Sequence, residues 1–411
     1  MKLIRTFDTQ LQTNLLILFT AGLLFWSSMA SLLPTLPIYI ESLGGNKQEV
    51  GLVMACFAVG LLLSRPWLGR LADMRGRKIV LIIGIAVAVL APLSYLVATS
   101  IPLLMVMRVF HGISIAAFSI AFIAMVADIS PANQRGEIMS YMNLVNPIGM
   151  ALGPAIGGYI QALGGDKLLF LLSSEVALIA LLGALQVKNT SAPKSKKSNT
   201  QNHNFWQILI SERVRVPSIL MLLVGLALGA LHTFVPLYIK SANIDLNPGL
   251  FYTAAAIASF SVRLFTGRAS DRLGRGLFVT IGLVLYSLAM LLLWQAKSEV
   301  AFLVAAVFEG MGGGIFIPTI ATMLTDRAQP QERGRVFAIS LSGFDVGIGV
   351  GGAILGYLAQ NYGYPFLFAV TTGLTFLAVI IFVTLGNKDL GNSFKFAIGR
   401  APDKYALSNN N

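Results

Sequence analysis

Charged residues are scarce in this chain of 411 residues. Lys, Arg, Asp and Glu together make up 12% of the sequence, whereas apolar residues make up 55%. A typical soluble domain carries about 25% charged residues. The mean hydropathy of +0.74 is correspondingly high. This composition excludes an ordinary soluble protein, because so much apolar surface needs lipid as its solvent.

Cysteine and histidine are almost absent. Cys56 is the single cysteine, so a disulfide framework is excluded. The three histidines form no His-x3-His pair, and no acidic cluster accompanies them, so we expect no metal site. No Gly-x4-Gly-Lys-Ser/Thr loop occurs, which argues against direct use of ATP. We therefore expect no cofactor, and a membrane enzyme or a sensor is a disfavoured alternative.

Long apolar runs are abundant, and a helix needs about 20 residues to cross the hydrocarbon core. The sequence predicts an all-α membrane protein with twelve transmembrane helices. The first six predicted spans are 14–36, 50–71, 79–98, 102–127, 137–162 and 168–187. The second six are 216–239, 249–268, 277–296, 300–324, 336–360 and 364–386.

The basic residues, which give a net charge of +12, are placed asymmetrically. Most lie in the odd-numbered connections between spans and in the two tails; those expected on the opposite side are Lys47, Lys167, Lys240 and Lys297. This bias predicts cytoplasmic termini, as in a bacterial inner membrane. The positive charge then faces anionic membrane lipids, and we expect no nucleic-acid partner.

A ten-residue segment occurs twice. Residues 69–78 (GRLADMRGRK) recur as 267–276 (GRASDRLGRG), 198 residues later. The same offset relates Arg65 to Arg263, Gly112 to Gly310, Asp128 to Asp326, Arg135 to Arg333 and Gly153 to Gly351. One register across half a chain indicates a duplicated domain. We expect bundles at 1–187 and 216–386, a flexible cytoplasmic linker at 188–215, and a mobile cytoplasmic tail at 387–411.

Both copies fall between the second and third span of their half. We expect their glycines, Gly69, Gly76, Gly267 and Gly274, to permit tight turns and close helix approach. An acid adds nothing to the charge rule for topology, so Asp73 and Asp271 need another role. A carboxylate here can serve a helix N-terminus or a nearby Arg. The plain alternative is a turn cap.

The pattern Gly-x3-Asp-x2-Gly-Arg-Lys resembles the signature loop of the major facilitator superfamily, and the resemblance covers about residues 14–386. It implies a monomer of two six-helix bundles, related by pseudo-two-fold symmetry, that open a central site to alternate sides. It implies that Asp73 is a gating residue, with Arg77 and Asp128 as its partners. Asp271 and Arg275 would form a weaker mirror, because Gly276 stands where the first copy has Lys78.

Small residues recur every four positions in the fifth predicted span. Its residues Gly149, Gly153, Pro154, Gly157 and Gly158 resemble the motif of the drug:proton antiporter branch of that family. The resemblance implies export and a barrier to leak. The alternative is an ordinary packing seam, since small residues let helices approach closely and proline bends a helix.

Ionisable residues at membrane depth are functional candidates because their burial in lipid is costly. They are Arg108, His111, His232, Glu309 and Asp345. The Arg-x2-His-Gly of Arg108 to Gly112 resembles the family's Arg-x2-Gln-Gly motif, whose Arg is linked to proton coupling. His111 can titrate where Gln cannot, and Glu309 or Asp345 could carry the proton. Each could instead be structural, as we expect for Arg65, Glu175 and Arg263.

The leading interpretation is a proton-coupled exporter of a small organic molecule. The alternatives are a uniporter or symporter for a sugar, siderophore or other metabolite, or a lipid flippase on the same fold. The first predicted span has no acid between Asp8 and Glu41, which is atypical of pumps for cationic drugs. The expected partners are the small-molecule substrate, protons and membrane lipids.

Overall fold

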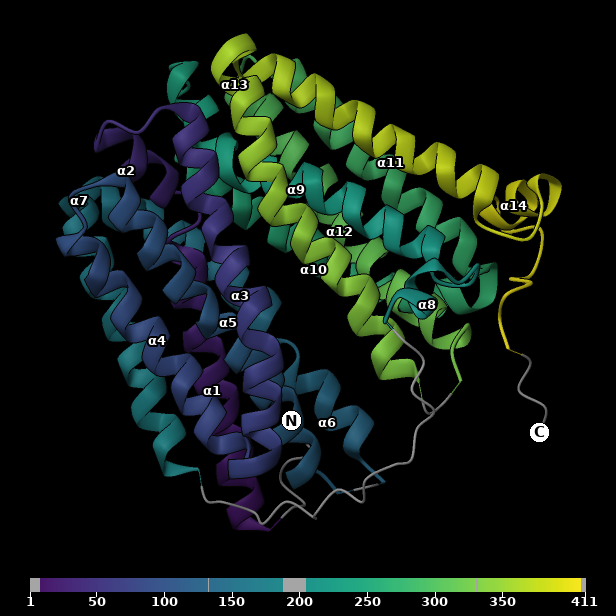
Figure 1. The fold of residues 1–411 in the computed structure, drawn as a ribbon, viewed down its shortest axis with the longest axis horizontal. Coiled ribbons are helices and arrows are strands. Elements are labelled where there is room, and N and C mark those ends of the chain that lie inside the picture. Colours follow the sequence, from purple (N-terminus) through teal and green to yellow (C-terminus); the bar gives the residue numbers. More distant parts are fainter. Residues whose placement is uncertain (1–7, 132, 188–204, 330–331, 408–411) are drawn as a thin grey trace. The chain divides into compact units, whose positions relative to one another are not determined.

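The computed structural model describes residues 8–131, 133–187, 205–329 and 332–407, and the regular structure in these ranges is entirely helical (Figure 1). The first half contains α1 (Thr9–Ser31), α2 (Leu36–Ser42), α3 (Lys47–Arg75), α4 (Arg77–Val97), α5 (Ile101–Ile129), α6 (Arg135–Met142) and α7 (Val145–Gln186). The second half contains α8 (Phe205–Ile210), α9 (Arg215–Ser241), α10 (Pro248–Leu273), α11 (Arg275–Trp294), α12 (Glu299–Asp326), α13 (Arg333–Leu385) and α14 (Leu390–Ala397).

Ten helical segments in the described residues are long and apolar enough to cross a membrane. Two of them contain a break, at Gly165 in α7 (φ 70°) and at Gly363 in α13 (φ 83°). Glycine adopts such positive φ angles without steric cost. Each break joins two of the predicted spans, so the ten segments accommodate all twelve. The two breaks are themselves 198 residues apart.

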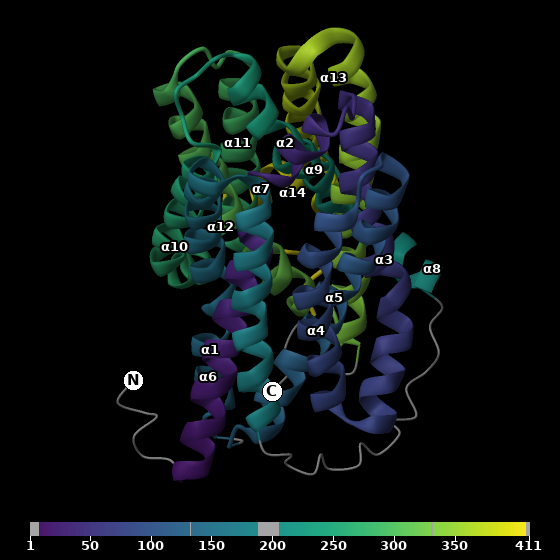
Figure 2. The same cartoon turned by 90° about the vertical axis from the view of Figure 1, so that its left-hand side faces the viewer.

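The chain forms two compact units. The first comprises α1 to α7 without residues 46–51, together with residues 247–253, and the second comprises the remaining helices. In the first unit α1 packs on α7, and α4 packs on both α5 and α7. In the second, α9 packs on α13, and α11 packs on both α12 and α13. Figure 2 shows α4 beside α5 within the first unit. Equivalent helices therefore make equivalent contacts in the two units.

Glycines at equivalent positions bring equivalent helices into backbone contact. A Cβ atom on Gly112 of α5 would overlap the carbonyl oxygen of Phe57 in α3. A Cβ on Gly310 of α12 would overlap the carbonyl oxygen of Ala255 in α10 in the same way. Such close approach is how helices associate in lipid, where apolar side chains gain little by leaving the solvent. The duplicated register therefore holds in the packing as well as in the sequence.

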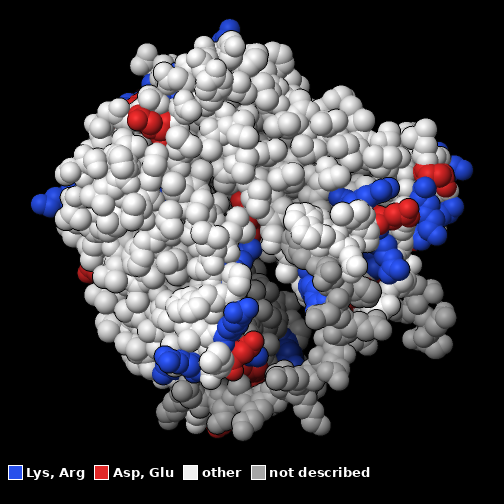
Figure 3. All heavy atoms as spheres, in the orientation of Figure 1, with Lys and Arg blue, Asp and Glu red and all other residues white. Residues whose placement is uncertain are grey.

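Large apolar side chains point outward along the helices. Leu63 is 75% exposed, Trp67 57% and Val97 67%. The face of the molecule in Figure 3 is mostly uncharged, with Lys, Arg, Asp and Glu confined to small groups. An apolar exterior of this extent is suited to contact with lipid.

The segment after the last span is folded, whereas the sequence analysis predicted a mobile tail. The helix α14 begins at Leu390 and is capped by Asp389, whose carboxylate accepts a hydrogen bond from the backbone N–H of Asn392 at 2.9 Å. The backbone and side-chain hydrogen bonds from Asn392 lower the pKa of the Asp389 carboxyl. Phe396 and Ala397 are buried. The prediction was wrong because a polar stretch can still place a few apolar residues on one face.

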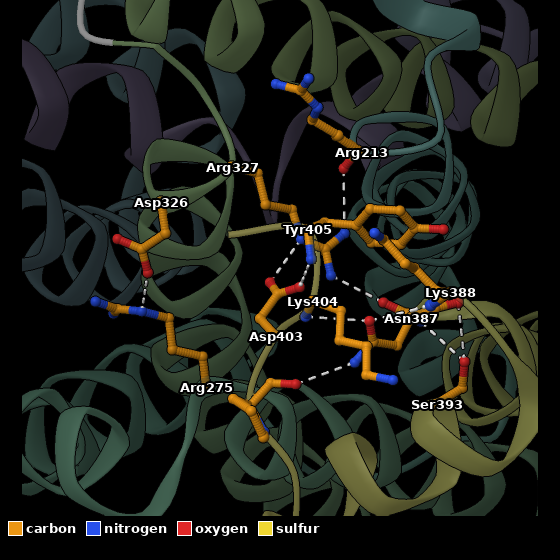
Figure 4. Close-up of polar contacts among 12 residues, drawn as sticks. Arg213, Arg275, Asp326, Arg327, Asn387, Lys388, Ser393, Asp403, Lys404 and Tyr405 are labelled. Atoms are coloured by element: carbon orange, nitrogen blue, oxygen red, sulfur yellow. Dashed lines mark hydrogen bonds and ion pairs between the residues drawn. The ribbon is translucent and has the colours of Figure 1, made fainter. Parts of the chain in front are cut away.

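Arg327, directly after α12, holds this segment in place (Figure 4). Its side chain is 0% exposed, and its Nε lies 2.6 Å from Oδ2 of Asp403. Its other nitrogens donate to the carbonyl oxygen of Arg213 at 3.1 Å and to that of Gly386 at 2.8 Å. The ring of Tyr405 lies 5.1 Å from the guanidinium carbon. One buried cation thus joins α12, the start of α9, the end of α13 and the tail.

Two further contacts dock α14 on α11. Gly276 has no room for a side chain, because a Cβ there would overlap the carbonyl oxygen of Phe396. Thr280 donates a hydrogen bond to the carbonyl oxygen of Ala397 at 2.9 Å. The second copy therefore has glycine at position 276, where the first has Lys78, because only glycine leaves room for α14 to pack there.

The connection between the halves is described only in part. Residues 188–204 lie outside the described residues, and α8 occupies residues 205–210. The assignment of 188–215 as a cytoplasmic linker stays a prediction.

We expect Arg327→Gln and Asp403→Asn each to lower the free energy of unfolding by about 3–5 kcal/mol, because each leaves the other partner buried without its counter-charge. Thermal unfolding of the purified protein in detergent measures this loss as a lower midpoint. Arg400→Gln, which removes an exposed charge from the same segment, should leave the midpoint unchanged. Equal midpoints for all three variants would show that Arg327 does not anchor the tail.

Candidate functional site

The first unit buries a cation and an imidazole on α5. Arg108 is 7% exposed and His111 is 1% exposed, one helical turn apart. The guanidinium of Arg108 stacks over the ring of Phe57 at 4.6 Å. Its Nη1 lies 3.5 Å from Nδ1 of His111, which is a long hydrogen bond. The two residues that the sequence analysis paired are therefore neighbours.

The hydrogen bonds of His111 fix its tautomer. The Tyr95 hydroxyl lies 2.7 Å from Nδ1 of the ring, and Nε2 lies 3.1 Å from Sδ of Met29. Arg108 can only donate, so the Nδ1 atom that it faces must accept. The ring therefore carries its proton on Nε2 and is neutral in this arrangement.

The second unit carries the acidic candidates. His232 lies on α9, Glu309 on α12 and Asp345 on α13, and each is half-buried. The fully buried Tyr286 of α11 interacts electrostatically with both Glu309 and Arg263. The candidate residues of the two halves thus differ: the first has Arg108 and His111 on α5, whereas the second has Glu309 and Asp345 in addition to His232.

An ion pair occurs at the same place in each copy of the signature loop. Arg77, at the start of α4, pairs with Asp128 near the end of α5, and its Nη1 donates to the carbonyl oxygen of Ala124 at 2.6 Å. Arg275 and Asp326 form the equivalent pair between α11 and α12 (Figure 4). These positions differ by the repeat length of 198 residues. Each pair joins the third span of its half to the end of the fourth.

The two acids of the signature loop differ in their surroundings. Asp73 is exposed near the end of α3, and Arg77 is paired with Asp128. Asp271 is also exposed, but its Oδ1 lies 3.3 Å from Nη1 of Arg275. The loop acid thus joins the ion pair in the second copy, whereas Asp73 has its carboxylate at the surface.

The glycines of the loop divide into two kinds. Gly76 and Gly274 have φ angles of 96° and 97°, so each turn between helices needs glycine. Gly69 and Gly267 lie inside helices with open space around them, and the structure gives no reason for glycine there. Lys78 donates to the carbonyl oxygens of Leu185 and Val187 and so caps the end of α7.

The glycine-proline segment lies against α1 within its own unit. A Cβ on Gly153 would overlap the carbonyl oxygen of Ser27, and one on Gly157 would overlap that of Ser31. A Cβ on Gly149 would overlap the Cβ atom of Trp26. The second unit repeats the seam, with Gly347 and Gly351 of α13 against Leu222 and Leu226 of α9. Pro154 and Gly158 are buried on α7 as well. The segment is thus a packing seam, whatever further role it has.

Sequence reasoning missed several polar residues that complete these groups. Tyr95 and Tyr286 are aromatic residues with a hydroxyl inside otherwise apolar spans, and that combination was the available signal. Arg327 stands where the first repeat has Ile129, so the repeat register itself marked it as unusual. In the described ranges, no three His, Cys, Asp or Glu residues are grouped so as to hold a metal ion.

Comparison with known proteins places the chain among transporters. The family model described as Major Facilitator Superfamily matches residues 18–276 and 245–393. Multidrug resistance protein 1 of Bacillus subtilis is 28% identical over 92% of this chain and 96% of its own length. The staphylopine export protein of Staphylococcus aureus is 25% identical over 89% of this chain and 94% of its own length. The crystal structure of the nucleoside transporter NupG has a TM-score of 0.75 at 15% identity, covering 92% of this chain and 100% of that one.

We expect Gly157→Ala to destabilise the protein by about 1–3 kcal/mol, because the added methyl group meets the backbone of α1. Gly373→Ala is the matched control, since Gly373 is exposed in α13 with nothing near its missing Cβ. That change should be neutral or should stabilise by up to about 1 kcal/mol, the difference in helix propensity. Thermal midpoints in detergent measure both, and an unaltered Gly157→Ala midpoint would contradict the seam.

Proposed function

The chain belongs to the major facilitator superfamily, and we propose that it exports a small organic molecule in exchange for protons. As a member of that family it is a multi-pass secondary transporter of a small molecule, not an enzyme. The coupling ion, the direction of transport and the roles of single residues are the parts that we propose.

The direction of transport is supported by the relatives. Proteins named for multidrug resistance and for staphylopine export align along about nine tenths of this chain. The glycine-proline segment of α7 resembles the antiporter motif of the same branch. We therefore favour export over uptake, with a drug-like compound or a metabolite as cargo.

Proton coupling is supported by the carboxyl groups of the second unit. Glu309 and Asp345 lie within membrane-spanning helices, where a permanent charge is costly. A carboxyl group changes its charge by one unit when it takes up one proton, which is the change that a proton-driven cycle requires. We assign one of these two residues as the proton carrier. We propose that Arg108, His111 and His232 also take part in proton coupling or line the substrate cavity.

Gating is assigned to the two signature loops. Each loop combines a glycine turn with an Arg–Asp pair that fixes the adjoining helix ends. Asp73, whose carboxylate is exposed, is the proposed gating group, and Asp271 is its weaker counterpart. We place both loops and both termini on the cytoplasmic side of the cell membrane, where the basic residues would face anionic lipid. The protein is proposed to act as a monomer.

Everted membrane vesicles test the exchange. A compound-sensitivity screen of a strain lacking the protein first supplies a transported compound. Adding this compound to respiring vesicles should release protons from the lumen. The release is measured as recovery of the fluorescence of a pH-sensitive dye. Vesicles without the protein are the control. A transported compound that causes no pH change would refute proton exchange.

The same vesicles identify the proton carrier. Glu309→Gln and Asp345→Asn remove the titratable group with little change of shape. Loss of gradient-driven transport by about tenfold or more, with counterflow retained, is expected for the carrier. If both variants kept full gradient-driven transport, neither residue would carry the proton.

We expect Asp73→Asn to slow transport at least several-fold while leaving the thermal midpoint unchanged, because Asp73 is exposed. Asp271→Asn is the matched control in the second loop and should slow transport less. Initial rates of counterflow in proteoliposomes measure both effects. Wild-type rates for Asp73→Asn would exclude a gating role.

A further inference from the structure

Arg108 is a buried cation whose recorded surroundings are neutral. It contacts the ring of Phe57, the imidazole of His111 and the hydroxyl of Tyr95, and it acts electrostatically on Cys56. No ion pair of the described residues includes Arg108, and its Nε is buried without a hydrogen-bond partner. Among the described residues of its own unit, the guanidinium therefore has no counter-anion.

The neutral contacts of Arg108 do not offset the free-energy cost of burying its charge. An arginine side chain keeps its charge at any pH that a protein meets. Removing such a charge from water is costly even after the protein relaxes, and a cation–π contact recovers only part of that cost. His111 cannot supply the missing negative charge, because an imidazole is either neutral or positively charged. A compensating anion is therefore expected at some point in the transport cycle.

We propose that Arg108 binds an anionic group, a carboxylate or one of similar geometry, carried by the transported molecule. This inference rests on the proposed transport function and narrows its cargo to organic anions or zwitterions. A guanidinium is well suited to this role, because its N–H groups can grip both oxygens of a carboxylate. The absence of any acid between Asp8 and Glu41 agrees with it, since that span offers no carboxylate to a cationic cargo.

The same chemistry has a second source within the chain. Glu309 or Asp345 could supply the carboxylate instead of the cargo. The test must therefore detect an anion site at Arg108 and also determine whether the chain fills it.

Cys56 provides a native reporter. It is the single cysteine of the sequence, it is half-buried, and it directly precedes Phe57, whose ring stacks on Arg108. The charge of Arg108 acts on its thiol. A charged thiol reagent that reaches Cys56 therefore samples the electrostatic potential at the proposed site.

The probes are two methanethiosulfonates of opposite charge, the sulfonatoethyl and the trimethylammonioethyl reagents. The ratio of their rates at Cys56 in the purified protein is divided by their ratio with a small free thiol. This normalisation removes the intrinsic reactivity of each reagent and the ionised fraction of the thiol. We expect a preference for the anionic reagent of at least about tenfold, as one nearby charge at intermediate dielectric gives.

Three variants test the origin of the preference. It should disappear in Arg108→Gln and persist in Arg108→Lys, which keeps the charge. Arg65→Gln removes the same charge from the helix of Cys56, about 13 Å along its axis, and should leave the preference intact. If Arg108→Gln does not fold, the normalised rate ratio of the two reagents at Cys56 in the wild-type protein is the test of the proposal. A ratio no higher than that of the free thiol, a ratio that survives Arg108→Gln, or failure of both reagents to reach Cys56 would overturn the proposal.

The Glu309→Gln and Asp345→Asn variants separate the two sources. A preference unchanged in both supports the cargo as the source of the anion. A preference that rises in either would show that this residue normally neutralises Arg108, and the cargo assignment would fall. The outcome is independent of proton exchange: vesicles without proton release would leave the Cys56 preference standing, and its loss would leave proton release standing.

Discussion

The fold depends on one constraint: the hydrocarbon core of the membrane offers no hydrogen-bond partners to the backbone. Peptide groups within the hydrocarbon core must bond to one another, so the spans are helices. The helices in turn must hold together without a strong hydrophobic drive. This chain meets that second demand with glycine: Gly112 and Gly310 each place a helix backbone on a neighbouring carbonyl oxygen, and Gly153 and Gly351 do the same at another pair of helices. Each unit is assembled around such contacts.

The two halves kept this framework and diverged around it. The turns at Gly76 and Gly274 and the breaks at Gly165 and Gly363 have nearly the same φ angles in both copies. The candidate polar residues at membrane depth differ between the copies: His111 of the first corresponds to Glu309 of the second. At the end of the signature loop, the Lys78 ammonium group donates to a carbonyl oxygen at the end of α7. At the equivalent position, Gly276 leaves room for α14 to pack against α11. The two copies therefore share their backbone geometry, whereas side chains at equivalent positions differ and make different contacts.

The spans and the repeat could be predicted because they are regular along the sequence. The offset of 198 residues predicted equivalent bundles. The family resemblance grouped Arg77 and Asp128 as partners of Asp73, and the structure pairs Arg77 with Asp128. The partners of the buried groups could not be predicted. Arg327 is satisfied by Asp403, 76 residues away, and no local pattern links the two. The partner of the glycine row on α7 depends on how helices turn about their axes, which hydropathy does not record. The hydrogen-bond partners of His111 include Tyr95 and Met29, which lie on two other helices.

The link between Arg327 and Asp403 also sets an order of events during synthesis. The pair Arg77–Asp128 joins residues that are both made before the first bundle is complete, so that bundle can close while the ribosome is still translating the second. The second bundle waits for its counter-charge until residue 403 has emerged. Until then Arg327 lacks this partner, and the carboxyl-terminal half cannot complete the contacts that hold its tail.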